Sequence, residues 1–203
     1  MKMNLPNKLT VLRLCLVPVI VIVGMLPASV IPHLISCVIC AALFIATSVT
    51  DMLDGKIARR DGLVTDFGKF LDPVADKFMV IGAMFVLLYK FPAFRLPMII
   101  TLIVVVFREL AVTSMRLVVS TGKGVVVAAN YLGKIKTVSQ IVFVSTMFLE
   151  PVVEWFIELF LKDYVLHGVY PLSWLSMAFT LFMTVWSGIN YITSYWKFLD
   201  PQK

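Results

Sequence analysis

Charged residues are scarce in this 203-residue sequence. Asp, Glu, Lys and Arg make up 15% of it, against roughly 25% in an ordinary soluble domain. Residues 14–50 and 164–196 contain none of them, and each segment exceeds the roughly 20 apolar residues that one transmembrane helix needs. With 60% apolar residues and a mean hydropathy of +0.95, the composition excludes a soluble globular protein and predicts an integral membrane protein.

Cysteine is also rare. The three cysteines, Cys15, Cys37 and Cys40, all fall in apolar segments without accompanying ligands, so we expect small buried apolar side chains rather than a metal site or a disulfide. No repeat of 20–50 residues and no low-complexity tract occurs. We therefore expect one membrane domain that covers residues 1–203.

The apolar segments predict an all-α integral membrane protein with six transmembrane helices. Pro27 and Pro32 divide the first long segment into two spans, and further spans are expected at about 73–89, 97–119, 135–157 and 172–195. With the N-terminus inside, every Lys and Arg except Lys90, Arg95 and Lys162 lies on the cytoplasmic side. Because cationic loops stay in the cytoplasm, we expect both termini there, with the active site facing the cytoplasm in the cell membrane.

The formal net charge of +6 is explained by this lopsided distribution. Basic residues near a membrane surface face anionic lipid headgroups. Nothing in the sequence resembles a base-reading module, so we expect membrane lipids as partners and no nucleic acid.

Four carboxylates lie at the membrane edge, where negative charge is costly. Asp51 and Asp54 are three residues apart and Asp72 and Asp76 are four apart, so each pair shares a helix face. A polar connection is expected over about 55–71, between the second and third spans. A hairpin of these spans would bring all four together, and they would repel one another unless cations neutralised them. Hard divalent ions prefer oxygen ligands, so we expect two divalent cations, Mg²⁺ or Mn²⁺.

Two such ions are the usual means of holding a phosphoryl group while its bond to a leaving oxygen breaks. The sequence between the carboxylate pairs suits a phosphate-bearing substrate. Gly55 and Gly68 allow close approach, Ala58 is small, and Arg59 carries a forked cation that matches phosphate. One of the acids could accept the proton of an attacking hydroxyl group. The alternative, that these acids cap helix ends or pair with nearby basic residues, leaves their spacing unexplained.

The complete string is D-x2-D-G-x2-A-R-x8-G-x3-D-x3-D, from Asp51 to Asp76. It resembles, without a mismatch, the signature of the CDP-alcohol phosphatidyltransferase family. The resemblance implies a homodimer of six-helix subunits in which two divalent metals hold the diphosphate of a CDP-linked lipid such as CDP-diacylglycerol. It also implies roles for single residues. Asp51, Asp54, Asp72 and Asp76 would be metal ligands, Asp76 also the catalytic base, and Asn7, Thr10, Asp54, Gly55, Ala58, Arg59 and Gly68 would bind the CDP-lipid.

Two later clusters concern the second substrate. Arg108, Glu109 and Arg116 form R-E-L-x4-R, in which Glu109 and Arg116 share a helix face, and Lys134 and Lys136 belong to G-K-x-K-T-x2-Q. Four cations beside an acidic site predict an anionic acceptor, so we expect Arg108, Arg116, Lys134 and Lys136 to bind the phosphate of a phosphorylated alcohol. Alternatively, the lysines are membrane anchors and the arginines extend to the interface. The alternative that Asn7 or Thr10 only caps a helix end at the membrane interface is also left open.

These clusters and the N-terminal P-N-x-L-T-x2-R resemble the branch of the family whose acceptor is sn-glycerol 3-phosphate. From this resemblance, Asn7, Thr10 and Arg13 are expected near the nucleotide or diphosphate. The rivals are the same chemistry with inositol phosphate, serine or a lipid alcohol, and, remotely, a cation transporter. A transporter needs access from both faces, whereas these acids cluster at one. Glu150, Glu154 and Glu158 recur every four residues and are expected to form a solvated outer face.

Overall fold

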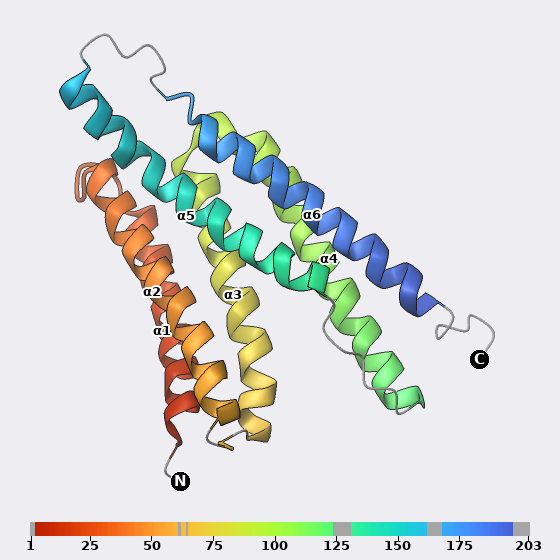
Figure 1. Cartoon of the computed structure of the whole chain (residues 1–203). Coiled ribbons are helices and arrows are strands. Elements are labelled where there is room, and N and C mark those ends of the chain that lie inside the picture. The colour runs from red at the N-terminus through yellow and green to blue at the C-terminus, as the bar shows by residue number, and fades with distance from the viewer. Residues whose placement is uncertain (1–2, 61, 64, 124–130, 162–167, 197–203) are drawn as a thin grey trace.

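The computed structural model describes residues 3–60, 62–63, 65–123, 131–161 and 168–196, without the side chains of Asp54, Ala58, Arg59 and residues 120–123. These residues contain long α-helices and one short 3₁₀-helix, and no β-strand (Figure 1). In chain order the elements are α1 (Leu5–Met25), α2 (His33–Arg60), α3 (Asp66–Lys90), η1 (Pro92–Phe94), α4 (Arg95–Lys123), α5 (Tyr131–Phe160) and α6 (Pro171–Tyr195). The all-α prediction is confirmed.

Local sequence explains where the first helices begin. The side chain of Asn4 accepts a hydrogen bond from the backbone N–H of Asn7 and so caps α1, where proline stands in the first turn. Thr65 caps α3 in the same way through the N–H of Gly68, 3.1 Å away. Pro27 and Pro32 lie between α1 and α2, as predicted.

The connection between α2 and α3 is shorter than the sequence suggested. We expected a polar connection over about 55–71, yet α2 continues to Arg60 and α3 begins at Asp66. Gly55 lies inside α2, since one glycine costs a helix only about 1 kcal/mol. Gly62 adopts φ +65, a left-handed conformation that glycine takes easily and that commonly follows a helix end.

The helices form two groups (Figure 1). In the first, α1 packs on α2 and α3. In the second, α4 packs on α6, and α5 links the groups through contacts with α2 and α6. The contact between α1 and α3 depends on glycine, because a Cβ atom on Gly24 would lie 2.1 Å from Cγ1 of Val86. Since α1 and α3 begin at the end of the bundle where α2 finishes, the segments that carry the predicted site meet there.

Five helical segments of the described residues are long and apolar enough to cross a membrane. They are Leu5–Met25, His33–Ile57, Pro92–Val119, Tyr131–Phe160 and Pro171–Tyr195. Their outer surfaces carry large apolar side chains such as Ile22, Ile103 and Phe182, which suit contact with lipid better than with water. The protein is therefore a multi-helix membrane protein. The remaining helix, α3, carries Asp72, Asp76 and Lys77 near its start, and a sixth span there stays a prediction.

One acidic residue of α5, Glu150, differs from the sequence prediction. Glu150 is 7% exposed rather than solvated. Its carboxylate accepts hydrogen bonds from the backbone N–H groups of Leu172 and Ser173, at 2.8 and 2.7 Å, and from the Ser173 hydroxyl. Glu150 therefore caps the start of α6, where free N–H groups favour a negative charge.

The cysteine prediction is right for two residues and wrong for one. Cys37 and Cys40 are buried, whereas Cys15 is exposed. Cys15 lies in an apolar segment of α1, and a small apolar side chain can face lipid there as readily as protein.

Candidate functional site

A buried arginine joins two of the predicted carboxylates. Nη1 of Arg13, on α1, lies 2.6 Å from Oδ1 of Asp51 on α2 and 2.9 Å from Oδ1 of Asp76 on α3. The Arg13 side chain is fully buried, while the side chains of Asp51 and Asp76 are 35% and 45% exposed. The carboxylates therefore share one cation on their buried side and keep an open side toward the end of the bundle.

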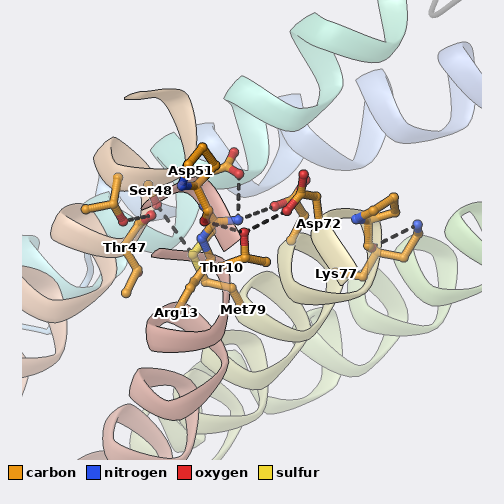
Figure 2. A network of polar contacts seen from close by, with 12 residues as sticks. Thr10, Arg13, Thr47, Ser48, Asp51, Asp72, Lys77 and Met79 are labelled. Carbon is orange, nitrogen blue, oxygen red and sulfur yellow. Dashed lines mark hydrogen bonds and ion pairs between the residues drawn. The ribbon is translucent and has the colours of Figure 1, made fainter. Parts of the chain in front are cut away.

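A second contact from α1 brings in Asp72. Oγ1 of Thr10 donates a hydrogen bond to Oδ1 of Asp72 at 2.7 Å. Arg13 and Thr10 are three residues apart and so lie on one face of α1. In Figure 2 the side chains of Thr10, Arg13, Asp51 and Asp72 converge from three helices. The structure thus brings together Asp51, Asp72 and Asp76, as their spacing predicted.

Asn7 and Gly68 meet just beside this network. Nδ2 of Asn7 donates to Oγ1 of Thr65 at 3.0 Å. A Cβ atom on Gly68 would lie 2.9 Å from Oδ1 of Asn7 and 3.9 Å from Oδ2 of Asp72, closer to Asn7 than real Cβ contacts allow. Gly68 is therefore required for the approach of α3 to α1, whether or not a nucleotide also binds there.

Three predicted residues cannot be placed completely. The side chains of Asp54, Ala58 and Arg59 lie outside the described part of the structure, although their backbone belongs to α2. Gly55 is described and partly exposed on the same helix.

The donor set of the network suits hard divalent cations. Asp51, Asp72 and Asp76 supply only oxygen atoms, which Mg²⁺ and Mn²⁺ prefer, and the guanidinium of Arg13 pairs with Asp51 and Asp76. Three carboxylates and one guanidinium leave an excess of negative charge that a divalent ion would balance. No three carboxylate, imidazole or thiolate groups of the described residues converge as a finished ligand set.

Replacing Arg13 with Met is expected to make the stability of the protein depend on divalent ions. Removing one partner of a buried ion pair costs about 3–5 kcal/mol, which corresponds to a fall in Tm of about 6–20 °C for a chain of this size. In EDTA we expect that fall; millimolar Mg²⁺ or Mn²⁺ should recover part of it, because a bound ion stabilises the folded state. Thermal unfolding in detergent measures both, with Arg95→Met, at an exposed position, as the control. A Tm of the Arg13 variant that is the same with and without the ions would contradict a metal site here.

A separate cluster of charges lies where α4 approaches α5. Oε1 of Glu109 accepts a hydrogen bond from Nζ of Lys136 and another from Nη1 of Arg108, the latter at 3.2 Å. The Lys136 side chain is 4% exposed and that of Arg108 is 10% exposed. Lys77 on α3 interacts electrostatically with Glu109 and Lys136. The ammonium group of Lys77 itself donates to the backbone oxygen of Pro73 at 3.2 Å. Arg108 and Lys136 share the single carboxylate of Glu109 and leave a largely buried surplus of positive charge, which favours an anionic ligand. We call Lys77, Arg108, Glu109 and Lys136 the cationic cluster.

The other two predicted phosphate ligands lie apart from this cluster. Arg116 donates through Nε to the hydroxyl of Tyr191 on α6, at 2.7 Å, and its guanidinium lies 5.2 Å from the centre of that ring. Lys134 is exposed. We expected Glu109 to orient Arg116 because they share a helix face. That expectation is wrong, since the carboxylate of Glu109 pairs with Lys136 on α5 instead.

Three features of the site escaped the sequence argument. Arg13 was expected near the nucleotide, but not as the partner of two carboxylates. Lys77 was counted only as a cytoplasmic cation, although its position next to Asp76 puts it between the acidic network and the rest of the cationic cluster. No sequence pattern indicated a role for Tyr191, because its partner Arg116 lies 75 residues away in the chain.

Comparisons with known proteins agree with this geometry. A family model described as CDP-alcohol phosphatidyltransferase matches residues 3–186. A Bacillus subtilis (strain 168) protein named CDP-diacylglycerol–glycerol-3-phosphate 3-phosphatidyltransferase is 39% identical over 207 residues, covering 97% of each chain. A Yersinia enterocolitica protein of the same name is 30% identical over 203 residues, covering 99% of this chain and 100% of its own.

Proposed function

The chain belongs to the CDP-alcohol phosphatidyltransferase family, and from this membership we propose that it transfers the phosphatidyl group of CDP-diacylglycerol to sn-glycerol 3-phosphate. The products are phosphatidylglycerophosphate and CMP, in the synthesis of anionic phospholipids. Full-length relatives that carry this activity in their names support the substrates. The proposal rests on one observation, that Asp51, Asp72 and Asp76 converge around Arg13 and Thr10.

At the acidic network we propose that the diphosphate of the donor binds through two divalent cations, held by Asp51, Asp54, Asp72 and Asp76. When bound, the ions neutralise the diphosphate and draw electrons from the reacting phosphorus. Asp76 accepts the proton of the acceptor hydroxyl as that oxygen forms its bond to phosphorus, and the bond to the cytidylate oxygen breaks. Arg13 holds Asp51 and Asp76 in place from their buried side.

The residues around the network would recognise the rest of the donor. Asn7 and Thr10 on α1 and Gly68 on α3 border the carboxylates directly. Gly55, Ala58 and Arg59 lie on the last turns of α2. We assign these residues to the cytidine and diphosphate of the CDP-lipid.

At the cationic cluster we propose that Arg108 and Lys136 bind the phosphate of the acceptor. Both are buried and share one carboxylate, so an incoming phosphate would find surplus positive charge. Lys77, also of this cluster, interacts with Glu109 and Lys136 and directly follows Asp76, which would bring the acceptor hydroxyl toward its base. Arg116 and Lys134 contribute less, since Arg116 binds Tyr191 and Lys134 is exposed.

The same proposal covers the membrane topology and the oligomeric state of the enzyme. Residues 1–203 form one membrane domain with six spans, α3 included, in the cytoplasmic membrane. Both termini and the acidic network face the cytoplasm, as the distribution of Lys and Arg favours. The chain works as a homodimer.

The choice of acceptor is tested by giving the purified protein CDP-diacylglycerol with one acceptor at a time. We expect sn-glycerol 3-phosphate to yield a new phospholipid and CMP, and inositol phosphate, serine or a lipid alcohol to give at least about tenfold less. Chromatography of the lipid products and EDTA controls complete the measurement. No product with sn-glycerol 3-phosphate, but product with another alcohol, would replace the acceptor and keep the family chemistry. Ion flux without CMP release would favour a transporter.

A further inference from the structure

A cavity of about 200 Å³ lies between α4 and α6, on the side of the cationic cluster away from α1. The residues that line it include Phe107, Arg108, Ala111, Thr184, Gly188 and Ile189. Thr184 donates its hydroxyl to the backbone oxygen of Thr180, at 2.7 Å. The cavity therefore presents an apolar wall with a single cation, Arg108.

The cavity is accessible from the hydrocarbon of the bilayer. Phe107 and Ile189, one on each helix, are 69% and 58% exposed, and both lie within segments that can cross a membrane. A hydrophobic chain could enter sideways between them directly from the bilayer, without passing through water.

Arg108 connects this cavity to the cationic cluster. Its aliphatic stem lies against α6, where a Cβ atom on Gly188 would stand 3.2 Å from Cγ of Arg108. Its guanidinium reaches toward α5, with Nη2 3.8 Å from the position of a Cβ atom on Gly133. Nε of Arg108 is buried and has no hydrogen-bond partner among the described residues. A buried donor left unpaired is costly, so this nitrogen suits an anionic ligand beside the cavity.

We propose that the α4–α6 cavity holds one acyl chain of the phosphatidyl group, beside the acceptor phosphate that binds Arg108. The inference rests on the proposed function and extends it to the lipid part of the substrate. An amphiphile with an apolar chain and a phosphate matches an apolar cavity that contains one arginine. When the acceptor hydroxyl attacks, the transferred phosphorus lies within one glycerol unit of the acceptor phosphate at Arg108 and Lys136, so the chain in the cavity belongs to the lipid that is transferred.

The test uses CDP-diacylglycerol with a photoreactive diazirine in one acyl chain. After irradiation of the full-length protein, we expect the label on peptides from residues 104–112 or 184–192, and unlabelled CDP-diacylglycerol should compete for it.

Ala111→Leu, which fills the cavity, should reduce the labelling at least about fivefold. It should also raise KM for a long-chain donor about tenfold, with little change for a dihexanoyl donor and for sn-glycerol 3-phosphate. Ala178→Leu makes the same change at an exposed position of α6 outside the cavity and should leave all of these values unchanged.

Two results would overturn the inference while leaving the proposed function intact. One is normal transfer to sn-glycerol 3-phosphate with the label confined to other helices. The other is equal labelling of residues 104–112 and 184–192 by a diazirine phosphatidylcholine, which is not a substrate, since the cavity would then hold any bilayer lipid. The wild-type labelling decides both, so the inference does not depend on the folding of a variant. Absence of transfer to every acceptor would overturn the proposed function as well.

Discussion

Asp76→Asn is expected to lower kcat by about 10²–10⁴-fold, the usual contribution of a general base, and to leave KM for CDP-diacylglycerol within about threefold of its wild-type value. Asn has the same shape and keeps an oxygen that can accept the hydrogen bond from Arg13, which lies 2.9 Å from Oδ1 in the structure. It cannot accept the proton of the acceptor hydroxyl. Incorporation of labelled glycerol 3-phosphate measures kcat, and calorimetric binding of the donor with Mn²⁺ measures donor affinity.

Asp66→Asn is the matched control for this prediction. Asp66 stands on the same helix, but its side chain is 97% exposed and pairs with Lys69 at the surface, so activity should not change. If Asp76→Asn loses donor binding together with kcat, the main role of Asp76 is to hold the metal. If kcat falls less than about tenfold, another group takes the proton and Asp76 is not the base.

The acidic network was the part of the site most readily predicted from sequence. Spacings of three and four residues put Asp51 with Asp54 and Asp72 with Asp76 on common helix faces, and a hairpin of two consecutive helices brings the pairs together. The place of Arg13 could not be predicted in this way. It depends on how deeply α1 packs against α3, and that packing is decided by glycines at the contact, among them Gly24 against Val86.

The cationic cluster shows the opposite case. Residue types and sequence order predicted an anionic acceptor, but helical periodicity alone paired Glu109 with Arg116. In the folded chain, an interface between helices brings the ammonium group of Lys136 closer to the Glu109 carboxylate than the guanidinium of Arg108 on α4 itself. A buried carboxylate takes the partner that removes most of its desolvation cost, and that partner came from another helix. Periodicity predicts which face a residue occupies, whereas the helix that covers this face is a property of the fold.

The length of the α2–α3 connection has a similar origin. Gly55 and the polar residues after it suggested a loop, yet α2 stays helical to Arg60. The longer helix is what carries Gly55, Ala58 and Arg59 past the carboxylates on regular helical turns. The signature therefore lies on rigid helices for most of its length, which favours a preorganised site.

Lys136→Met is expected to raise KM for sn-glycerol 3-phosphate at least about 30-fold, with KM for CDP-diacylglycerol nearly unchanged. Truncating one partner of a buried charge pair costs about 2–5 kcal/mol, and each 1.4 kcal/mol corresponds to about a tenfold change in affinity. Lys136 is 4% exposed and shares Glu109 with Arg108. Without it, Glu109 neutralises Arg108, and little positive charge remains for an acceptor phosphate.

The same change is also expected to destabilise the fold, so a second variant separates stability from binding. Lys136→Met combined with Glu109→Gln removes both charges of the pair and should recover most of the lost Tm, because no carboxylate then remains buried without its lysine. Its KM for sn-glycerol 3-phosphate should stay high. Lys8→Met, at an exposed position of α1, is the charge control. If the double variant recovers acceptor affinity along with stability, Lys136 serves only to neutralise Glu109, and the acceptor phosphate binds elsewhere.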